Sequence, residues 1–555
     1  MFVKELVVVG YFALLLGIGA LARRRARGTA DDYFIASRSL PPLVLFLTMA
    51  ATNFSAFTVF GFSGAGWRIG YAFYPIMAFG TAFMALSFYF IGRPVWKLGK
   101  ERGLITPPEF IFDRFGSTTL RLLFFTVLTV FTLPYLAMQP MAAGYALEGL
   151  LGIPYLAGAA LITAVMLLYT FFGGMRGVAW TDVFQGGALI VLLFVALGMI
   201  AAPFGGIAAA NRAAAAQMPQ LFSRPGMGDA LGPGIWLGYM LLWLLCDPMF
   251  PQLFQRFYAA RNERALGITM SLYPLITGTL FLLPVAIGVI GRLAFPSLPA
   301  DTASDKILPL LLEGYVPPVV EALVLTAALA ALMSTLDSQL LTLSSMFTRD
   351  LVEPLSKRGH HTSPWVGKLF VIGLALVGLA IAVRPPATFL TIATETFTGL
   401  AVLFPTVISG LYWRRATAKG AIASIITGEG LVIAYHFHAL PSFGTLAVIP
   451  VVVITSVVLV AVSIGTRSHA RARGPVSGRE RPHLGWKWIA IFAVMFILGN
   501  DFWNWGDGKL GPLGFPWWVW YFLGLCVLLA VLFWVLTVRS NVEGEKSERA
   551  DDAKR

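Results

Sequence analysis

Four side chains that could bind a cation recur on one face of an otherwise apolar stretch. Ser334, Asp337, Ser338 and Ser345 follow a helical spacing within residues 317–347. Hydroxyl and carboxylate oxygens are hard ligands, which suit a cation that has shed its water. Serines in a membrane helix also serve as hydrogen-bonding links between helices. That alternative explains Asp337 poorly, because an isolated buried carboxylate is expensive. The pattern therefore predicts an ion site.

Two other stretches carry residues that interrupt a helix. Residues 50–56 read AATNFSA and are followed by several glycines, and residues 246–251 read CDPMFP. Proline removes an amide donor and disrupts the preceding turn. Breaks at membrane depth are tolerated where they line a cavity, and in transporters built from two inverted repeats the broken helices surround the binding site. Both stretches are predicted to be broken helices beside a ligand.

These residues belong to a chain whose composition excludes a water-soluble globule. Of its 555 residues, 57% are hydrophobic and 12% are charged, against roughly 25% charged in a typical soluble domain. A membrane-spanning helix needs about 20 apolar residues. Fifteen such segments are predicted: 2–22, 41–66, 73–93, 119–149, 155–174, 181–204, 234–257, 265–291, 317–347, 365–384, 387–409, 417–437, 445–465, 487–500 and 515–538.

The basic residues indicate the orientation of these segments. With the N-terminus outside, alternate loops hold 33 of the 41 Lys and Arg residues, including the cluster at 23–27. Such a bias is typical of cytoplasmic loops. It accounts for the net charge of +13 without a nucleic-acid partner. We therefore expect an integral protein of a bacterial or archaeal cytoplasmic membrane, with its N-terminus outside, its C-terminus inside and the lipid bilayer as its solvent.

The chain resembles the sodium/solute symporter family over about residues 5–465. The motifs that carry the resemblance are 32–40 (DYFIASRSL), 106–110 (TPPEF), 114–117 (RFGS), 173–182 (GGMRGVAWTD) with Gln185 and Gly186, 333–339 (MSTLDSQ) and 410–417 (GLYWRRAT). The resemblance implies an all-α membrane fold, a five-plus-five inverted repeat of the LeuT type with one extra helix before it and several after it.

The predicted segments divide the chain into the following parts, of which the C-terminal hairpin lies beyond the resemblance. They are an extra N-terminal helix and loop (1–40), a first repeat of five helices (41–204), an extracellular loop (205–233), a second repeat (234–409), two further family helices (410–465), a basic cytoplasmic loop (466–486), a Trp-rich C-terminal hairpin (487–538) and a cytoplasmic tail (539–555). Tryptophans of the hairpin are expected at a membrane interface, where aromatic residues gather.

The resemblance also implies ion sites. Its shared sodium site corresponds to the backbone carbonyls of Ala51, Phe54 and Ala331 and the hydroxyls of Ser334 and Thr335. A second site found in some relatives corresponds to Asp182, Asp337 and Ser338. Two carboxylates in one small site raise the pKa of one of them unless a cation neutralises the pair. A second sodium and a carried proton are both open there.

Candidate substrate residues flank the predicted breaks. They are Asn53, Ser55 and Phe57, Tyr135 and Gln139, Trp243 and Asp247, and Glu395 and Thr398. For each of them, packing or helix-to-helix hydrogen bonding is an alternative role. No Lys or Arg lies deep in a predicted segment, which disfavours a dianionic substrate, although the N-terminus of a half-helix could hold one carboxylate.

Together these features predict a sodium-coupled symporter of a small organic solute, such as a monocarboxylate or an amino acid. A proton-coupled transporter of the same fold and a transporter-like sensor with a separate partner are the alternatives. An enzyme is disfavoured because the six histidines, all at or after His360, lack zinc-ligand spacing. A channel is disfavoured as well, because it would need a continuous polar pore, which the two broken helices do not suggest. The sequence predicts neither the solute nor the oligomeric state.

Overall fold

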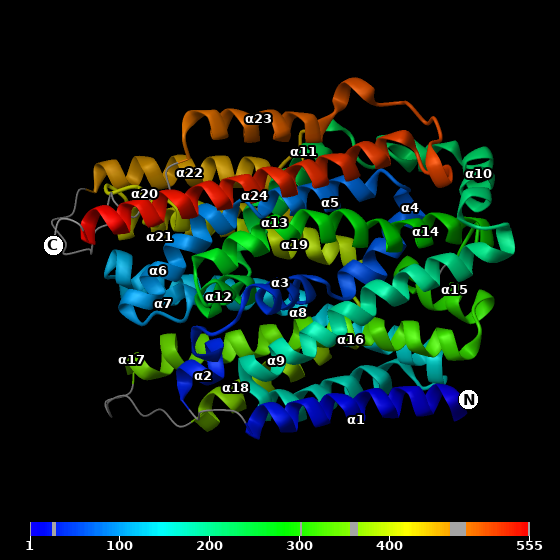
Figure 1. Ribbon diagram of the computed structural model, residues 1–555, viewed down its shortest axis with the longest axis horizontal. Coiled ribbons are helices and arrows are strands. Elements are labelled where there is room, and N and C mark those ends of the chain that lie inside the picture. The colour runs from blue at the N-terminus through cyan, green and yellow to red at the C-terminus, as the bar shows by residue number, and fades with distance from the viewer. Residues whose placement is uncertain (1, 25–28, 300–301, 356–363, 467–483, 553–555) are drawn as a thin grey trace.

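The computed structural model describes residues 2–24, 29–299, 302–355, 364–466 and 484–552. Within these ranges the regular structure is helical, apart from two isolated bridges between extended residues. Figure 1 shows most helices running side by side along the long axis, with the two termini at opposite ends. Most of the predicted basic loop 466–486 and residues 25–27 of the basic cluster lie outside the described residues.

Ten of the described helices are long and apolar enough to cross a membrane. They are Phe2–Leu21, Phe73–Arg102, Thr118–Leu151, Gly174–Phe204, Glu263–Ala294, Pro318–Val352, Phe389–Tyr412, Ala418–His436, Val448–Gly465 and Trp517–Ser540. Two bent pairs, Pro42–Asn53 with Phe57–Ile69 and Pro233–Met249 with Pro251–Ala259, bring the number to twelve if each pair is one span.

Three predicted segments correspond to shorter helices. The segments 155–174, 365–384 and 487–500 contain the apolar helices Tyr155–Leu168, Leu369–Ala382 and Trp486–Asn500. Each of the fifteen predicted segments thus coincides with a helix or a bent pair of helices in the described chain. The number of fifteen spans itself stays a prediction.

The first predicted break is confirmed. This span consists of α3 (Pro42–Asn53), the wide turn η2 (Phe57–Gly61) and α4 (Phe62–Ile69), and its two parts meet at 61°. Phe54 leaves the helical conformation, with φ −84° and ψ 98°. Short polar side chains on both sides of Phe54 offer the backbone local hydrogen bonds that compete with a helix.

Side chains satisfy the amides that this break frees. The N–H of Ala56 donates to Oε1 of Gln139 at 3.1 Å. The N–H groups of Phe57 and Ser55 donate to the hydroxyls of Ser55 and Thr58, at 3.2 and 3.3 Å. Backbone groups without access to water must find partners within the protein. The break is therefore closed by its own polar residues and by one glutamine from a neighbouring helix.

The second predicted break is confirmed as well. Helix α11 (Pro233–Cys246) is followed by a turn, η7 (Asp247–Met249), and by α12 (Pro251–Ala259), with a bend of 54°. Phe250 is extended between them, with φ −57° and ψ 123°. The prolines at 248 and 251 cannot donate to the preceding turn, which explains why the helix stops here.

Helix α4 lies so close to α14 (Leu282–Ala294) that two positions require glycine. A Cβ on Gly288 would collide with the carbonyl oxygen of Ser63, and a Cβ on Gly66 would collide with that of Val285. Small residues let helix backbones approach each other where no hydrophobic force drives helices together in lipid. The second half of the first broken helix is thereby held directly against α14.

The C-terminal hairpin is more than an aromatic belt. It comprises α23 (Trp486–Asn500) and α24 (Trp517–Asp552), and α24 packs along α13 (Glu263–Leu280). Trp503 is exposed, as expected at an interface. Trp518, by contrast, is buried beneath the guanidinium of Arg224, whose Cζ lies 5.0 Å from the ring centroid. The tryptophans therefore contribute to internal packing as well as to the membrane boundary.

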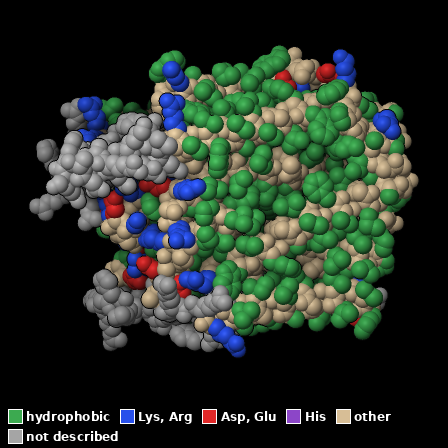
Figure 2. All heavy atoms as spheres, viewed as in Figure 1, with side chains coloured by type: hydrophobic (Ala, Val, Ile, Leu, Met, Phe, Trp, Pro, Cys, Tyr) green, Lys and Arg blue, Asp and Glu red, His purple; other side chains and the backbone are tan. Residues whose placement is uncertain are grey.

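Charged side chains gather at one end of the molecule. Figure 2 shows Lys and Arg at the end that holds α2 (Ala30–Ile35), α6 (Arg93–Arg102) and α7 (Pro107–Phe115), while hydrophobic side chains cover the long face. A continuous apolar face suits contact with lipid tails. The basic end matches the side predicted to be cytoplasmic, and that orientation stays a prediction.

Candidate functional site

The hydroxyl of Thr335 lies at the centre of the first candidate ion site. Its Oγ1 is 3.0 Å from the carbonyl oxygen of Thr52 and 3.3 Å from that of Phe54. A third carbonyl, of Ala331, is 3.3 Å away, one turn earlier on α16 (Pro318–Met346). The amide of Ala56, which would bond Thr52 in a continuous helix, donates to Gln139 instead. The break thus frees carbonyl oxygens, which are ligands that suit an alkali cation.

The structure brings together three of the five residues expected at the sodium site. Thr335, Phe54 and Ala331 converge, and the carbonyl of Thr52 takes the place expected for that of Ala51. Ser334 turns away from this cluster, since its hydroxyl donates to Oδ1 of Asp182 at 2.6 Å. The two adjacent hydroxyls therefore serve two neighbouring polar clusters.

Asp182 forms the second cluster with a buried arginine. Nη2 of Arg256, on α12, lies 3.2 Å from the Asp182 carboxylate, and both side chains are fully buried. The same nitrogen donates to the hydroxyl of Ser338 at 2.7 Å. Thr48 of α3 donates to the carboxylate and accepts from Nε of Arg256 at 3.1 Å. One ion pair thus joins α3, α9 (Tyr155–Ala201), α12 and α16.

This arrangement bears on two expectations from the sequence, and the second ion site stays a prediction. Arg256, one residue from the end of the predicted segment 234–257, is fully buried, because the break lets α12 carry it into the protein interior. The place expected for a second sodium or a proton, between Asp182 and Ser338, contains a guanidinium group. Asp337 is buried on the same helix, where its charge acts on Arg256 and on Tyr11 of α1 (Phe2–Arg24).

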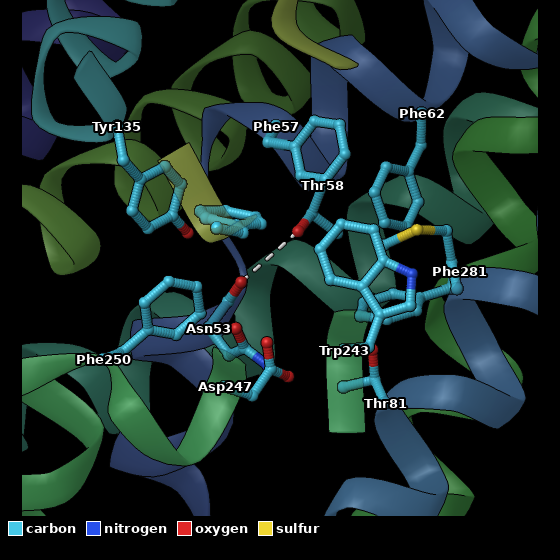
Figure 3. A pocket seen from close by; sticks show the side chains of 12 residues that line it. Asn53, Phe57, Thr58, Phe62, Thr81, Tyr135, Trp243, Asp247, Phe250 and Phe281 are labelled. Carbon is cyan, nitrogen blue, oxygen red and sulfur yellow. Dashed lines mark hydrogen bonds between the residues drawn. The ribbon is translucent and has the colours of Figure 1, made fainter. Parts of the chain in front are cut away.

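A small, partly open cavity lies between the two breaks. Its wall is formed by Asn53, Phe57, Thr58, Phe62, Met77, Thr81, Tyr135, Trp243, Asp247, Phe250, Phe281 and Phe397. Figure 3 shows the polar ends of Asn53 and Asp247 together, with the rings of Tyr135, Phe250 and Trp243 around them. The site is therefore mainly aromatic, with a small polar region where the two broken helices meet.

Five of the nine candidate substrate residues lie in this wall. They are Asn53, Phe57, Tyr135, Trp243 and Asp247. Ser55 and Gln139 lie beside the cavity, where they cap the broken helix. Thr398, on α19 (Phe389–Ala401), donates its hydroxyl to the carbonyl of Thr394 at 2.7 Å. Glu395 on the same helix is half-exposed and lies 3.1 Å from His436.

The remaining wall residues escaped sequence reasoning. Thr58 and Phe62 lie four residues apart beyond the first break, and Met77 and Thr81 have the same spacing on α5 (Phe73–Met84). This i, i+4 spacing places each pair on one helix face. For Thr58 and Phe62 this spacing could have indicated a cavity-facing pair, because both residues follow directly on the predicted break. Nothing in the sequence marked Phe281 or Phe397.

Asp305 links three elements at the end of the molecule opposite the basic end. It lies on η8 (Ser304–Lys306), and its Oδ2 accepts the N–H of Phe389, at the start of α19, at 2.9 Å. Arg68 of α4 lies 3.8 Å from its Oδ1. Burial raises the pKa of Asp305 to about 6, against the opposing effects of Arg68 and of the Phe389 amide.

Acidification should therefore stabilise the folded protein, because it removes the cost of burying the Asp305 charge. The pKa of Asp305 is about 6 in the folded protein, against 3.8 for an ordinary aspartate. The free energy of unfolding therefore falls as the pH rises through about 6, and it increases as the pH drops below 6. Between pH 7.5 and pH 5 the gain is about 1.4 kcal/mol. The melting temperature of the detergent-solubilised protein, compared with that of Asp305→Asn, measures this effect. An identical pH dependence in both proteins would contradict it.

Comparison with protein families matches residues 33–428 to the model described as "Sodium:solute symporter family". The sodium/pantothenate symporter of Haemophilus influenzae is 27% identical over 469 residues, covering 80% of this chain and 94% of the relative. The sodium/glucose cotransporter of Vibrio parahaemolyticus is 28% identical over 483 residues, covering 79% and 86%. These matches confirm the family resemblance drawn from the sequence motifs.

Solved structures show the same fold. A Na⁺-coupled sialic acid symporter in a substrate-bound, outward-open state superposes with a TM-score of 0.71 at 23% identity, covering 85% of this chain and 99% of that one. Mhp1, a nucleobase-cation-symport-1 family transporter, superposes with a TM-score of 0.53 at 13% identity, covering 80% and 98%. The predicted all-helical transporter fold of the LeuT type is thereby confirmed.

Proposed function

Because the chain belongs to the sodium:solute symporter family and is a sodium-coupled membrane transporter, not an enzyme, we propose that it imports a small organic solute by alternating access. The observation that supports this proposal most directly is the pair of broken helices, which meet at a mainly aromatic cavity and free carbonyl oxygens beside it. The solute is of the size of an amino acid, a monocarboxylate or a similar metabolite.

In this proposal the coupling sodium ion binds at the first candidate ion site, which we call the Thr335 cluster. Its ligands are the Thr335 hydroxyl and the carbonyls of Phe54, Ala331 and either Ala51 or Thr52. The Ser334 hydroxyl joins them if it leaves Asp182. One sodium ion crossing 100 mV yields about 2.3 kcal/mol, and a tenfold sodium gradient adds about 1.4 kcal/mol. Together they suffice to concentrate a neutral solute roughly several hundredfold.

Transport into proteoliposomes tests the function. The purified protein should accumulate a solute from a panel of amino acids, amines and monocarboxylates only when a sodium gradient is present. Uptake that follows a proton gradient alone would favour the proton-coupled alternative. Solute binding without any uptake would favour the sensor.

Oriented proteolysis of the tails in the same vesicles would test the expected topology, with the N-terminus outside and the C-terminus inside.

The variant Asp337→Asn tests whether a second ion is transported. If Asp182, Asp337 and Ser338 hold a second transported sodium or proton, Asp337→Asn should change the number of ions moved per solute or the pH dependence of uptake. The physical reason is that removing one of two buried carboxylates removes the charge that a second cation would neutralise. Reversal potentials of transport at several sodium concentrations and pH values measure both quantities. No change in either would leave Asp337 with a structural role.

A further inference from the structure

The cavity contains one ionisable side chain that has no ionic partner. Asp247 is 2% exposed, and its Oδ2 has no hydrogen-bond partner. Its neighbours that can donate are the weak donor Sγ of Cys246, 3.5 Å from Oδ1, and the side-chain amide of Asn53. Asp182 and Asp350, two other buried acids, are paired with arginines at 3.2 and 2.7 Å. In the described part of the chain, Asp247 has no such pair.

A buried carboxylate in this position favours a cationic ligand. Removing an ion from water costs several kcal/mol, which an opposite charge or a bound proton offsets. None of the residues that line the cavity is Lys, Arg or His. A solute that supplied a positive charge would therefore complete the ion pair that the protein leaves open.

The break beside the cavity offers little to an anion. A half-helix N-terminus binds carboxylates through free N–H groups. Here the amides of Ser55, Ala56 and Phe57 already donate to the side chains of Thr58, Gln139 and Ser55. At the second break, Pro251 has no N–H, and the amides of Leu253 and Phe254 donate to the carbonyl of Phe250.

The aromatic wall suits a cation that is poorly hydrated. Phe397 stands among the rings of Phe250, Tyr135 and Trp243, at centroid distances of 4.8, 5.0 and 5.5 Å. All four rings line the same cavity as Asp247, and Figure 3 shows the rings of Phe250 and Trp243 on either side of its carboxylate. The faces of such rings attract organic ammonium groups. Aromatic cages recognise quaternary ammonium ligands such as choline, and here a carboxylate stands in the same wall.

We propose that the solute is a small organic ammonium ion, or a zwitterion that carries one, whose nitrogen pairs with Asp247 inside the aromatic cage. This inference rests on the proposed function and narrows its solute class. An amine or an amino acid satisfies it, and a monocarboxylate without nitrogen does not. In this proposal the sodium ion stays at Thr335, beside the carbonyls of Thr52 and Phe54 that flank Asn53.

Matched pairs of compounds separate charge from shape. Choline and its uncharged carbon isostere 3,3-dimethyl-1-butanol differ by one nitrogen, as do glycine betaine and 3,3-dimethylbutanoate. In sodium buffer, choline or glycine betaine should bind the purified full-length protein at least tenfold more tightly than its isostere. The affinities are measured by microscale thermophoresis and by the shift in melting temperature that each compound causes. Equal affinities within both pairs, or binding of none of the four compounds, would overturn the proposal.

Two variants and one control assign the effect to the cavity. Asp247→Asn should weaken binding of choline and of glycine betaine at least tenfold and leave binding of the uncharged 3,3-dimethyl-1-butanol unchanged. Phe397→Leu, which keeps the site apolar, should also reduce the ratio of affinities between each ammonium compound and its nitrogen-free isostere. Glu313→Gln removes an exposed carboxylate on α15 (Ile307–Tyr315) and should change neither. Undiminished choline binding in Asp247→Asn would overturn the assignment.

The proposed function can fail separately. Sodium-driven uptake of 3,3-dimethylbutanoate or of the uncharged isostere, unaffected by Asp247→Asn, would reject the ammonium site and leave the symporter intact. Choline binding that depends on Asp247 without any sodium-driven uptake would support the ammonium site and reject solute transport.

Discussion

Replacing Thr335 with valine should raise the sodium concentration needed for half-maximal uptake at least about tenfold, which corresponds to about 1.4 kcal/mol. Valine has the shape of threonine without its hydroxyl, so the packing of α16 is kept while one oxygen of the candidate ion site is lost. In the structure that oxygen lies 3.0–3.3 Å from three carbonyl oxygens. A partly dehydrated sodium ion cannot replace it with water in a site this deeply buried.

Thr335→Ser is the matched control because it restores the hydroxyl and removes a methyl group. It should keep sodium activation close to that of the unmodified protein. Ser334→Ala tests the neighbouring hydroxyl, which donates to Asp182 at 2.6 Å, and its effect on sodium activation should be the smaller of the two unless Ser334 reorients when sodium binds. Uptake with unaltered sodium dependence in Thr335→Val would place the coupling ion elsewhere. Sodium dependence is read from initial uptake rates at constant ionic strength.

The breaks could be predicted from the sequence because their causes are local. Two prolines around 248–251 and the polar run at 52–55 interrupt helices whatever surrounds them. Their positions in equivalent halves of the chain then pointed to a cavity between them. The polar face of α16 was visible for a similar reason, since helical spacing alone places Ser334, Asp337 and Ser338 together.

Arg256 could not be placed from the sequence, because its burial depends on a tertiary arrangement. It lies one residue from the end of the predicted segment 234–257, where basic residues usually face the cytoplasm. The bend of 54° redirects α12, so that this short helix packs against α16 instead of leaving the protein. Only the position of Asp182 on another helix explains why a guanidinium is tolerated there.

The rotation of α19 was equally hidden. Its spacing groups Glu395 and Thr398, but it does not say which face meets the cavity. Phe397 points inward, and Glu395 is half-exposed beside His436. Packing against neighbouring helices sets such a rotation, and one sequence contains no information on those neighbours. A polar residue in an apolar segment therefore marked the right helix and the wrong face.

Replacing Arg256 with methionine should destabilise the protein by about 3–5 kcal/mol, the usual cost of leaving one partner of a buried ion pair without the other. Methionine keeps most of the side-chain volume, so the loss is that of the charge and of its donors to Asp182, Ser338 and Thr48. The melting temperature in detergent, measured without sodium, reports the change. Arg349→Met, at an ion pair with Glu109 that is partly open to solvent, is the control and should cost less.

The double variant Asp182→Asn with Arg256→Met decides whether the pair itself is responsible. If the unpaired Asp182 carboxylate causes the loss, neutralising it should recover a large part of the stability, so that the two changes are not additive.

The same pair also predicts how sodium affects the stability of Arg256→Met. The guanidinium lies between Asp182 and Ser338, so its removal leaves an anionic, hydroxyl-lined place for another cation, and sodium should raise the melting temperature of Arg256→Met more than that of the unmodified protein. Equal stabilisation of both would mean that the guanidinium does not stand in for a metal ion, and that the pair serves only to join the four helices around it.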